Sequence, residues 1–175
     1  MFTNRPILRA AALNAGEMCE AKGLRFTANI AEGPIHVRGD AQALERLFLC
    51  ILENAVKYTP TGEVSLHAEV QNGSISVAIR DTGLGIAEKD LPHIFDRFYR
   101  ADQARSVEVR GSGLGMAIAR WIAETHQGTI TAASEVGKGS TFEVRLPVHS
   151  TEVAESSSRR PLKQKAVNAP ENAFT

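Results

Sequence analysis

The sequence has few cysteines, few aromatic residues and no excess of charge of either sign. Its 175 residues include two cysteines, and 6% are aromatic. Cys19 and Cys50 are too few and too widely spaced for a zinc site or a disulfide framework, which favours a reducing, cytoplasmic setting. Twenty basic residues balance twenty acidic ones, so no overall field attracts nucleic acid or an anionic membrane. Any attraction for phosphate must be local.

Long hydrophobic runs and a secretory signal are also absent from the sequence. Every apolar stretch is interrupted by polar residues well short of the roughly 20 residues that span a bilayer. With 43% hydrophobic residues, the chain has enough apolar material for a core. Its length leaves no room for a second full domain. These features predict one ordinary soluble domain.

The spacing of apolar residues predicts three helices. The first covers residues 6–22 and ends at Gly23. The second follows a cap at Asp40 and is stopped by the Thr59-Pro60 pair, and the third begins among glycines and ends at Gly128. The apolar faces expected for the first and third helices are Ile7, Ala10, Ala11, Leu13 and Met18, and Leu114, Ala117, Ile118, Trp121 and Ile122.

Alternating apolar residues predict the strands. Two short strands are expected at residues 24–30 and 35–37. A hairpin around Asn72-Gly73 ends at Asp81, and a second hairpin turns at residues 137–139. From residue 150 onward the sequence has little apolar periodicity, which is typical of a disordered tail. The predicted organisation is an N-terminal helix or linker remnant (1–23), one domain (24–149) and the tail (150–175).

The second predicted helix carries a polar stripe beside its apolar face. Cys50, Asn54 and Lys57 lie at intervals of four and three residues, which places them on one side. An amide oxygen at Asn54 can coordinate Mg²⁺, Lys57 can approach a phosphate, and Tyr58 can cover a nucleotide. The alternative is an ordinary polar rim. Glu53 lies about 100° around the helix from Asn54 and is assigned to solvent.

Two glycine-rich segments complement this stripe. Asp81 follows an apolar strand and precedes Gly83 and Gly85, so its carboxylate can accept the amino hydrogen of adenine, although turn capping is an alternative. The third helix opens with exposed N–H groups that suit a phosphate, and a bare glycine turn is the alternative. The glycines that precede or open it are Gly111, Gly113 and Gly115.

Aromatic and charged residues alternate between these two segments. Phe95, Phe98 and Tyr99 are interleaved with Arg97 and Arg100 before a weakly periodic stretch that runs to residue 110. This pattern predicts a mobile lid whose aromatics anchor one end and whose arginines neutralise a terminal phosphate. The alternative is a surface loop pinned by its aromatics.

Together, residues 24–148 resemble the catalytic and ATP-binding domain of two-component sensor histidine kinases, in the superfamily that includes gyrase and a heat-shock chaperone. The resemblance rests on four ordered boxes: NAVKYTP, DTGLGI, IFDRFYR and GSGLGMAIAR. It implies an α+β fold, a two-layer α/β sandwich of the Bergerat type with a mixed sheet packed against about three helices. ATP would lie beneath a lid rather than in a Rossmann or Walker site.

The resemblance also implies residue roles, with ATP and Mg²⁺ as cofactors. Asn54 would bind Mg²⁺, Lys57 and Arg100 would contact phosphates, Tyr58 would line the nucleotide pocket and Asp81 would recognise adenine. The expected catalytic residues are Asn54, Lys57, Arg97 and Arg100. The expected nucleotide-binding residues are Asn54, Lys57, Tyr58, Asp81, Gly83, Gly85, Ile86, Phe98, Arg100, Gly111, Gly113, Leu114 and Gly115.

Two departures from the family pattern bear on activity. Cys50 stands where sensor kinases usually carry asparagine, and a thiol is a poor ligand for Mg²⁺, so Cys50→Asn is expected to improve Mg-ATP affinity or turnover. The helix that bears the acceptor histidine is missing. The five histidines are scattered, and none is expected to be an acceptor; His126 is expected to complement a helix C-terminus.

The leading hypothesis is therefore a protein-histidine kinase domain. It would transfer the γ-phosphoryl group of ATP to a histidine on a dimerisation domain, supplied by a missing region or in trans, and a response regulator would be an indirect partner. No nucleic acid and no direct membrane contact are expected, although the resemblance allows a parent protein anchored in the inner membrane. The alternatives are a nucleotide-responsive regulatory module without productive transfer, and an anti-sigma-type serine kinase.

Overall fold

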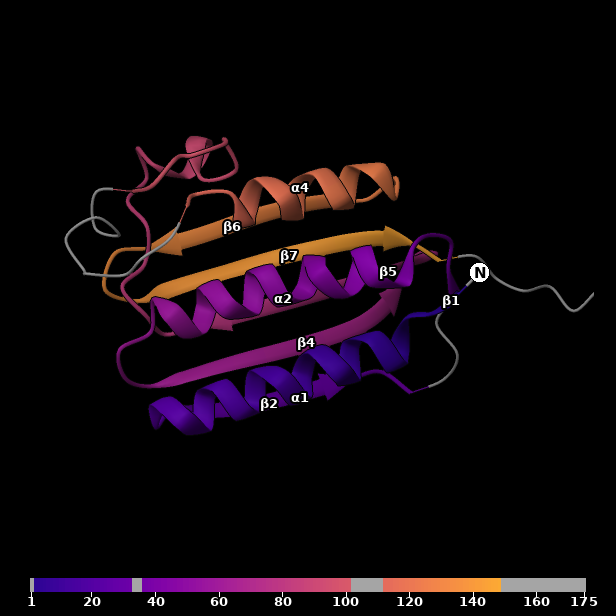
Figure 1. Ribbon diagram of the computed structural model, residues 1–175, viewed down its shortest axis with the longest axis horizontal. Helices are drawn as coiled ribbons and strands as arrows, with labels where there is room; N and C mark the ends of the chain where they lie inside the picture. The colour runs from indigo at the N-terminus through magenta and orange to yellow at the C-terminus, as the bar shows by residue number, and fades with distance from the viewer. Residues whose placement is uncertain (1, 33–35, 102–111, 149–175) are drawn as a thin grey trace, which may run out of the picture.

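A computed structural model describes residues 2–32, 36–101 and 112–148 of the chain (Figure 1). Five strands form one mixed sheet in the order β2-β4-β5-β7-β6, in which β2 and β4 are parallel and the other neighbours are antiparallel. Three helices lie on one face of this sheet (Figure 1). The predicted two-layer α/β sandwich is confirmed. The strands of this sheet are β2 (Arg25–Ile30), β4 (Glu63–Gln71), β5 (Ser74–Asp81), β6 (Thr129–Glu135) and β7 (Gly139–Pro147).

The helical elements are close to the predicted ones. They are α1 (Asn4–Lys22), α2 (Ala41–Lys57), α4 (Gly115–Thr125) and a short 3-10 turn, η1 (Leu91–His93). A separate two-stranded sheet pairs β1 (Phe2–Thr3) with β3 (His36–Val37). The predicted strand start at residue 35 and the predicted tail from residue 150 lie outside the described residues.

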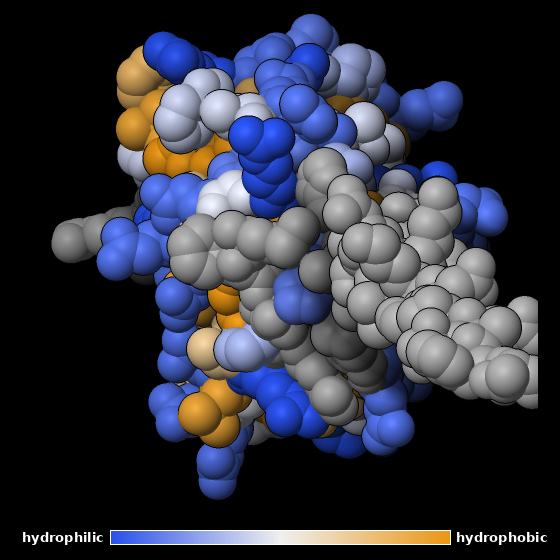
Figure 2. All heavy atoms as spheres, turned by 90° about the vertical axis from the view of Figure 1, so that its right-hand side faces the viewer, coloured by the Kyte–Doolittle hydropathy of each residue, from blue (hydrophilic) through white to orange (hydrophobic). Residues whose placement is uncertain are grey.

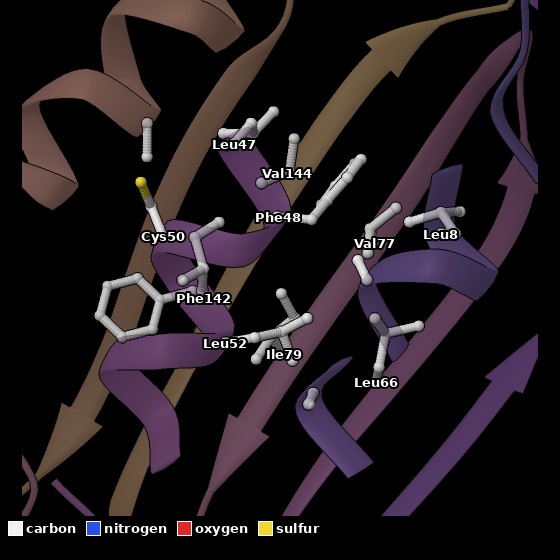
Figure 3. Packing of buried hydrophobic residues seen from close by; sticks show 14 of the residues in the cluster. Leu8, Leu47, Phe48, Cys50, Leu52, Leu66, Val77, Ile79, Phe142 and Val144 are labelled. Atoms are coloured by element: carbon white, nitrogen blue, oxygen red, sulfur yellow. The ribbon is translucent and has the colours of Figure 1, made fainter. Parts of the chain in front are cut away.

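The core lies between the helices and the buried face of the sheet. Sheet register places Leu66 opposite Ile79, and Val77 opposite Val144, so alternate apolar residues of β4, β5 and β7 face the helices. Figure 3 shows the side chain of Phe48 from α2 among these strand residues. Burial of such contiguous apolar surface stabilises the fold at roughly 25 cal/mol per Å². On the side shown in Figure 2, the described surface is mainly hydrophilic.

The apolar faces of α1 and α4 differ from the predicted ones. Leu13 of α1 is 66% exposed and Trp121 of α4 is 63% exposed, although both were expected to face the core. The buried face of α1 consists largely of small side chains, and two of the four buried residues of α4 are alanines; small side chains allow a helix to approach its neighbours closely. The buried residues are Leu8, Ala11, Ala12, Ala15 and Cys19 in α1, and Met116, Ala119, Ile122 and Ala123 in α4.

His126 joins the end of α4 to the beginning of α2. Its Nδ1 lies 2.7 Å from the carbonyl oxygen of Ile122, so Nδ1–H donates, and Nε2 accepts the backbone N–H of Asp40 at 3.0 Å. Asp40 in turn caps α2 through Oδ1, which accepts the N–H groups of Gln42 and Ala43. The prediction that His126 complements a helix C-terminus is confirmed, and the same ring also contacts the N-cap of α2.

Candidate functional site

A cavity of ≈ 490 Å³ opens between the end of α2, the loop after β5, the segment after η1 and the beginning of α4. Of the residues expected at the site, the structure brings ten to this cavity: Asn54, Lys57, Tyr58, Asp81, Gly85, Ile86, Arg100, Gly113, Leu114 and Gly115. The volume falls within the range of small-molecule sites. Residues from four separated stretches of sequence therefore line one cavity.

The last turn of α2 supplies an amide, an ammonium group and a phenol ring to one wall. Asn54, Lys57 and Tyr58 line the cavity, and Lys57 Nζ lies 5.0 Å from the centroid of the Tyr58 ring, a cation–π distance. Glu53 also reaches the cavity lining, where its Oε1 lies 3.8 Å from Nη1 of Arg46. Glu53 is exposed, as expected, but it lies beside the opening rather than away from it.

Asp81 ends β5 and is 4% exposed. Its Oδ1 accepts the backbone N–H of Gly83 at 2.8 Å and that of Ser140 at 3.3 Å. Burial raises the pKa of Asp81 above its ordinary value, and the hydrogen bonds from Gly83 and Ser140 oppose that shift. Asp81 therefore caps the turn through its hydrogen bond with Gly83, as the alternative interpretation expected. Its carboxylate also lines the cavity.

Gly83 and Gly85 let three backbone segments meet beside Asp81. A Cβ on Gly83 would lie 2.3 Å from the carbonyl oxygen of Tyr58, and a Cβ on Gly85 would lie 2.1 Å from that of Glu135. The backbone N–H of Leu84 donates to the same Tyr58 carbonyl at 3.1 Å. Gly83 does not line the cavity. Its close approach instead fixes the distance between the Asp81 loop and the end of α2.

The beginning of α4 faces the cavity with its backbone. Gly115 is the first residue of α4, and a Cβ placed on it would meet nothing within 4 Å. Leu114 at the N-cap makes no side-chain capping hydrogen bond. Exposed N–H groups and the positive end of the helix dipole make such a terminus suitable for an anion. Gly111, which was expected to contribute here, lies outside the described residues.

The segment after η1 is anchored by Tyr99 and Phe95. The Tyr99 hydroxyl donates to Oδ1 of the buried Asp90 at 2.6 Å, and the Phe95 ring meets Phe142 edge to face at 6.4 Å. Phe98 has a φ of 65° and is 70% exposed. Tyr99 and Phe95 therefore anchor this segment as expected, whereas Phe98 does not.

Phe98 and Arg97 do not line the cavity, although both were expected at the site. At Phe98 it is the backbone that meets the segment before α4, because its N–H donates to the carbonyl of Gly113 at 3.0 Å while the Phe98 side chain stays exposed. Arg100, three residues after Arg97, does line the cavity. Much of the segment expected to form a lid, residues 102–111, lies outside the described residues.

The comparisons with known proteins agree with this geometry. The model of the family described as "Histidine kinase-, DNA gyrase B-, and HSP90-like ATPase" matches residues 39–150. The chain belongs to this ATPase family. Members of this family bind ATP.

Curated relatives of this ATPase domain are sensor kinases. The chain is 36% identical over 143 residues to the sensor histidine kinase RppB of Synechocystis, covering 80% of this chain and 31% of that protein. It is 35% identical over 134 residues to the sensor histidine kinase WalK of Bacillus subtilis, covering 75% and 22%. The chain therefore spans about a third or less of the length of these relatives.

Solved structures show the same fold. The mycobacterial sensor histidine kinase MprB matches with a TM-score of 0.70 and 27% identity, over 81% of this chain and 96% of that one. The catalytic domain of the histidine kinase ThkA matches with a TM-score of 0.71 and 21% identity, over 83% and 93%, which supports the fold alone. The predicted resemblance to sensor histidine kinases and the predicted fold class are confirmed.

In this ATPase domain, Cys50 does not reach the cavity. It is 3% exposed and absent from the cavity lining, and its sulfur points toward α4 in Figure 3. Burial raises the pKa of the thiol. The interpretation of Cys50 as a poor metal ligand assumed that it faces the metal, and the structure does not place it there.

Several cavity residues were missed by sequence reasoning. Ser140 and Phe142 belong to β7 and reach the cavity because β7 pairs with β5, with Ser140 opposite Asp81. Tyr99 was expected only as an anchor. The other lining residues that were not expected are Arg46, Glu53, Ala55, Leu84, Ile94, Ala101, Ser112, Met116 and Ile118. The apolar ones offered no signal, since nothing separates them from core residues in sequence.

Proposed function

We propose that this chain is the catalytic domain of a sensor histidine kinase and transfers the γ-phosphoryl group of ATP to a histidine on a separate dimerisation domain. The observation that carries this proposal is the convergence of Asn54, Asp81 and the beginning of α4 on one cavity. These groups suit a metal, a base and a phosphate respectively. Family membership supplies the nucleotide, and the names of the relatives suggest the acceptor.

Asp81 is the residue proposed to recognise adenine. A buried carboxylate held by two backbone N–H groups has a fixed orientation, so it selects ligands with a matching hydrogen-bond donor. The exocyclic amino group of adenine is such a donor. The neighbouring Ile86 and Met116 supply apolar surface for the ring.

The phosphates are proposed to lie between the last turn of α2 and the first turn of α4. Lys57 and Arg100 bring positive charge to the lining, and the backbone of Gly115 is open to an anion. The amide oxygen of Asn54 is a suitable ligand for Mg²⁺, because Mg²⁺ prefers oxygen ligands. Phosphate oxygens and water molecules would complete its coordination. When bound, Mg²⁺ would neutralise charge on the phosphates.

Transfer requires positioning more than covalent chemistry by the protein. The acceptor imidazole nitrogen attacks the γ-phosphorus, the bond to the β–γ bridging oxygen breaks, ADP leaves with that electron pair, and the second ring nitrogen releases its proton to water. Lys57 and Arg100 would hold the phosphates in line for this attack. Arg97 remains a candidate only in a rearranged segment, since it lies outside the cavity lining.

The partners and location are proposals as well. The histidine-bearing dimerisation domain would come from a missing region or from another chain, and the phosphoryl group would pass on to a response regulator. A cytoplasmic location agrees with two free, buried cysteines. Among the described residues, no helix has both the length and the apolar character to cross a membrane.

The test is a titration of the purified chain with a non-hydrolysable ATP analogue, with and without Mg²⁺. Asp81→Asn is expected to weaken binding by about 10- to 100-fold, and Asn54→Ala is expected to remove the dependence on Mg²⁺. Incubation with radiolabelled ATP and a histidine-bearing dimerisation domain then tests transfer. Absence of wild-type binding would contradict the proposal. Binding without transfer to any matched domain would favour the regulatory-module alternative, and transfer to serine would favour the anti-sigma type.

A further inference from the structure

Lys22, the last residue of α1, reaches the end of α2. Its Nζ donates to the carbonyl oxygen of Val56 at 2.7 Å and to that of Lys57 at 3.0 Å. Val56 and Lys57 follow Lys22 by 34 and 35 positions in the sequence. A single side chain of α1 therefore holds the peptide units next to two cavity residues, Lys57 and Tyr58.

The end of α2 needs such a partner because its last carbonyl groups have no continuing helix to bond to. Tyr58 at the C-cap has a φ of −94°, so α2 does not end in a left-handed residue, and the N–H of Thr59 reaches the carbonyl of Val56 at 3.4 Å. The Thr59 hydroxyl donates a hydrogen bond to the carbonyl oxygen of Ala55 at 2.7 Å. The ammonium group of Lys22 covers the next two carbonyls and complements the negative end of the helix dipole.

The opposite side of the same turn is held by the loop that follows Asp81. The N–H of Leu84 donates to the carbonyl of Tyr58 at 3.1 Å, and Gly83 approaches that oxygen so closely that a Cβ would lie 2.3 Å from it. The last turn of α2 thus lies between α1 and the Asp81 loop. Lys22 determines one side of this arrangement, and the loop determines the other.

We propose that Lys22 is a positioning residue for the nucleotide site, and this inference rests on the proposed function. By fixing the carbonyl groups of Val56 and Lys57, it sets the direction in which Lys57 and Tyr58 enter the cavity. Lys22 itself is not among the cavity residues, so it acts through these neighbours. Its effect is expected mainly on the phosphate end of the ligand, because Lys22 bonds the peptide units on either side of Lys57, whereas the Asp81 carboxylate is oriented by the N–H groups of Gly83 and Ser140.

The test compares Lys22→Met, Lys22→Gln and Lys22→Arg with a matched control, Arg9→Met. Arg9 is an exposed cation of the same helix, so its removal changes the charge of α1 without touching α2. Lys22→Met is expected to weaken the affinity for a Mg-ATP analogue by about five- to tenfold, because small displacements of binding groups are costly. Affinity for adenosine is expected to stay unchanged, Lys22→Arg to restore binding of the analogue, and Arg9→Met to bind normally.

A merely structural role would give a different result. It would lower the denaturation midpoint of Lys22→Met while leaving the ratio of analogue to adenosine affinity unchanged, and that outcome would overturn the inference. If Lys22→Met does not fold, Lys22→Gln, which keeps a donor, carries the same comparison.

Separate measurements test the proposed function and the positioning role of Lys22. Absence of nucleotide binding by the wild-type chain would contradict the function. Backbone amide shifts of Tyr58 and Leu84, measured by NMR without nucleotide, then test the positioning itself. Unchanged shifts in Lys22→Met would overturn the inference, whereas displaced shifts that are absent in Arg9→Met support it.

Discussion

Asp81 accepts a hydrogen bond from the backbone N–H of Ser140, which lies 59 positions later in the chain. The two residues are also direct partners in the pairing of β5 with β7. The carboxylate is therefore held by the sheet as well as by its own loop. This arrangement makes the behaviour of Asp81 predictable in both binding and stability.

Replacing Asp81 by asparagine is expected to separate binding from folding. The amide keeps an oxygen for the N–H groups of Gly83 and Ser140, but it no longer offers a carboxylate to a ligand donor. Loss of a charge-assisted hydrogen bond predicts about 10- to 100-fold weaker binding of an ATP analogue. Calorimetric titration measures this, and chemical denaturation checks folding. Unaltered affinity would contradict the assignment of Asp81 to adenine.

The stability of the domain is expected to depend on the protonation of Asp81. Burial raises its pKa in the folded state above the unfolded value, so the folded state binds more protons. Asp81 therefore lowers the free energy of unfolding as the pH rises through its folded pKa, and the wild type loses more stability over this range than Asp81→Asn. Urea denaturation at a series of pH values measures the difference. Parallel curves for the two proteins would contradict the shift.

The same protonation is expected to govern ligand affinity with the opposite sign. Protonated Asp81 offers fewer acceptor sites to an amino donor, so affinity for the ATP analogue should fall as the pH drops through the raised pKa. Titrations from neutral to acidic pH measure the midpoint of this loss. If affinity is lost with a midpoint at the ordinary pKa of aspartate, burial does not control the protonation of Asp81.

Replacing Cys50 by asparagine is expected to lower stability without improving affinity for Mg-ATP. The thiol is buried and outside the cavity, so an amide there needs hydrogen-bond partners, and without them the free energy of unfolding falls by about 1–3 kcal/mol. Cys50→Ala is the control, since it removes the thiol without adding a polar group. A gain in Mg-ATP affinity for Cys50→Asn alone would restore the interpretation drawn from the sequence.

Removal of residues 1–23 is expected to prevent stable folding. Leu8, Ala11, Ala15 and Cys19 of α1 are fully buried in the same core as α2 and the sheet. Their loss would expose this apolar surface to water. Circular dichroism and thermal denaturation of the shortened chain test the prediction. A cooperative transition like that of the full chain would instead support the domain start predicted at residue 24.

The sequence predicted those parts of the site that depend on short-range chemistry. Asp81 is the last residue of a strand and precedes a glycine turn, and Asn54 and Lys57 share a helix face, so local spacing was enough to identify each of them as a site residue. Ser140 and Lys22 escaped prediction because sheet register and helix packing create their contacts across long stretches of chain. Phe98 was misplaced because its backbone contacts Gly113 while its ring is exposed, a pairing of distant residues that the sequence does not reveal.

The faces of α1 and α4 show the same limit in the core. Leu13 and Trp121 are large and apolar, which made them natural core candidates, yet both are exposed. Where helices lie close to their neighbours, alanine and other small residues occupy the contact instead. Periodicity alone does not reveal how closely two elements approach.

The contact of His126 with Asp40 has a mechanical consequence. It joins the end of α4 to the beginning of α2, whereas the cavity lies at the beginning of α4 and the end of α2. One imidazole ring therefore fixes the spacing of the two helices at the ends that lie away from the cavity, so the side chain that caps the end of α4 also limits how far α4 can separate from α2.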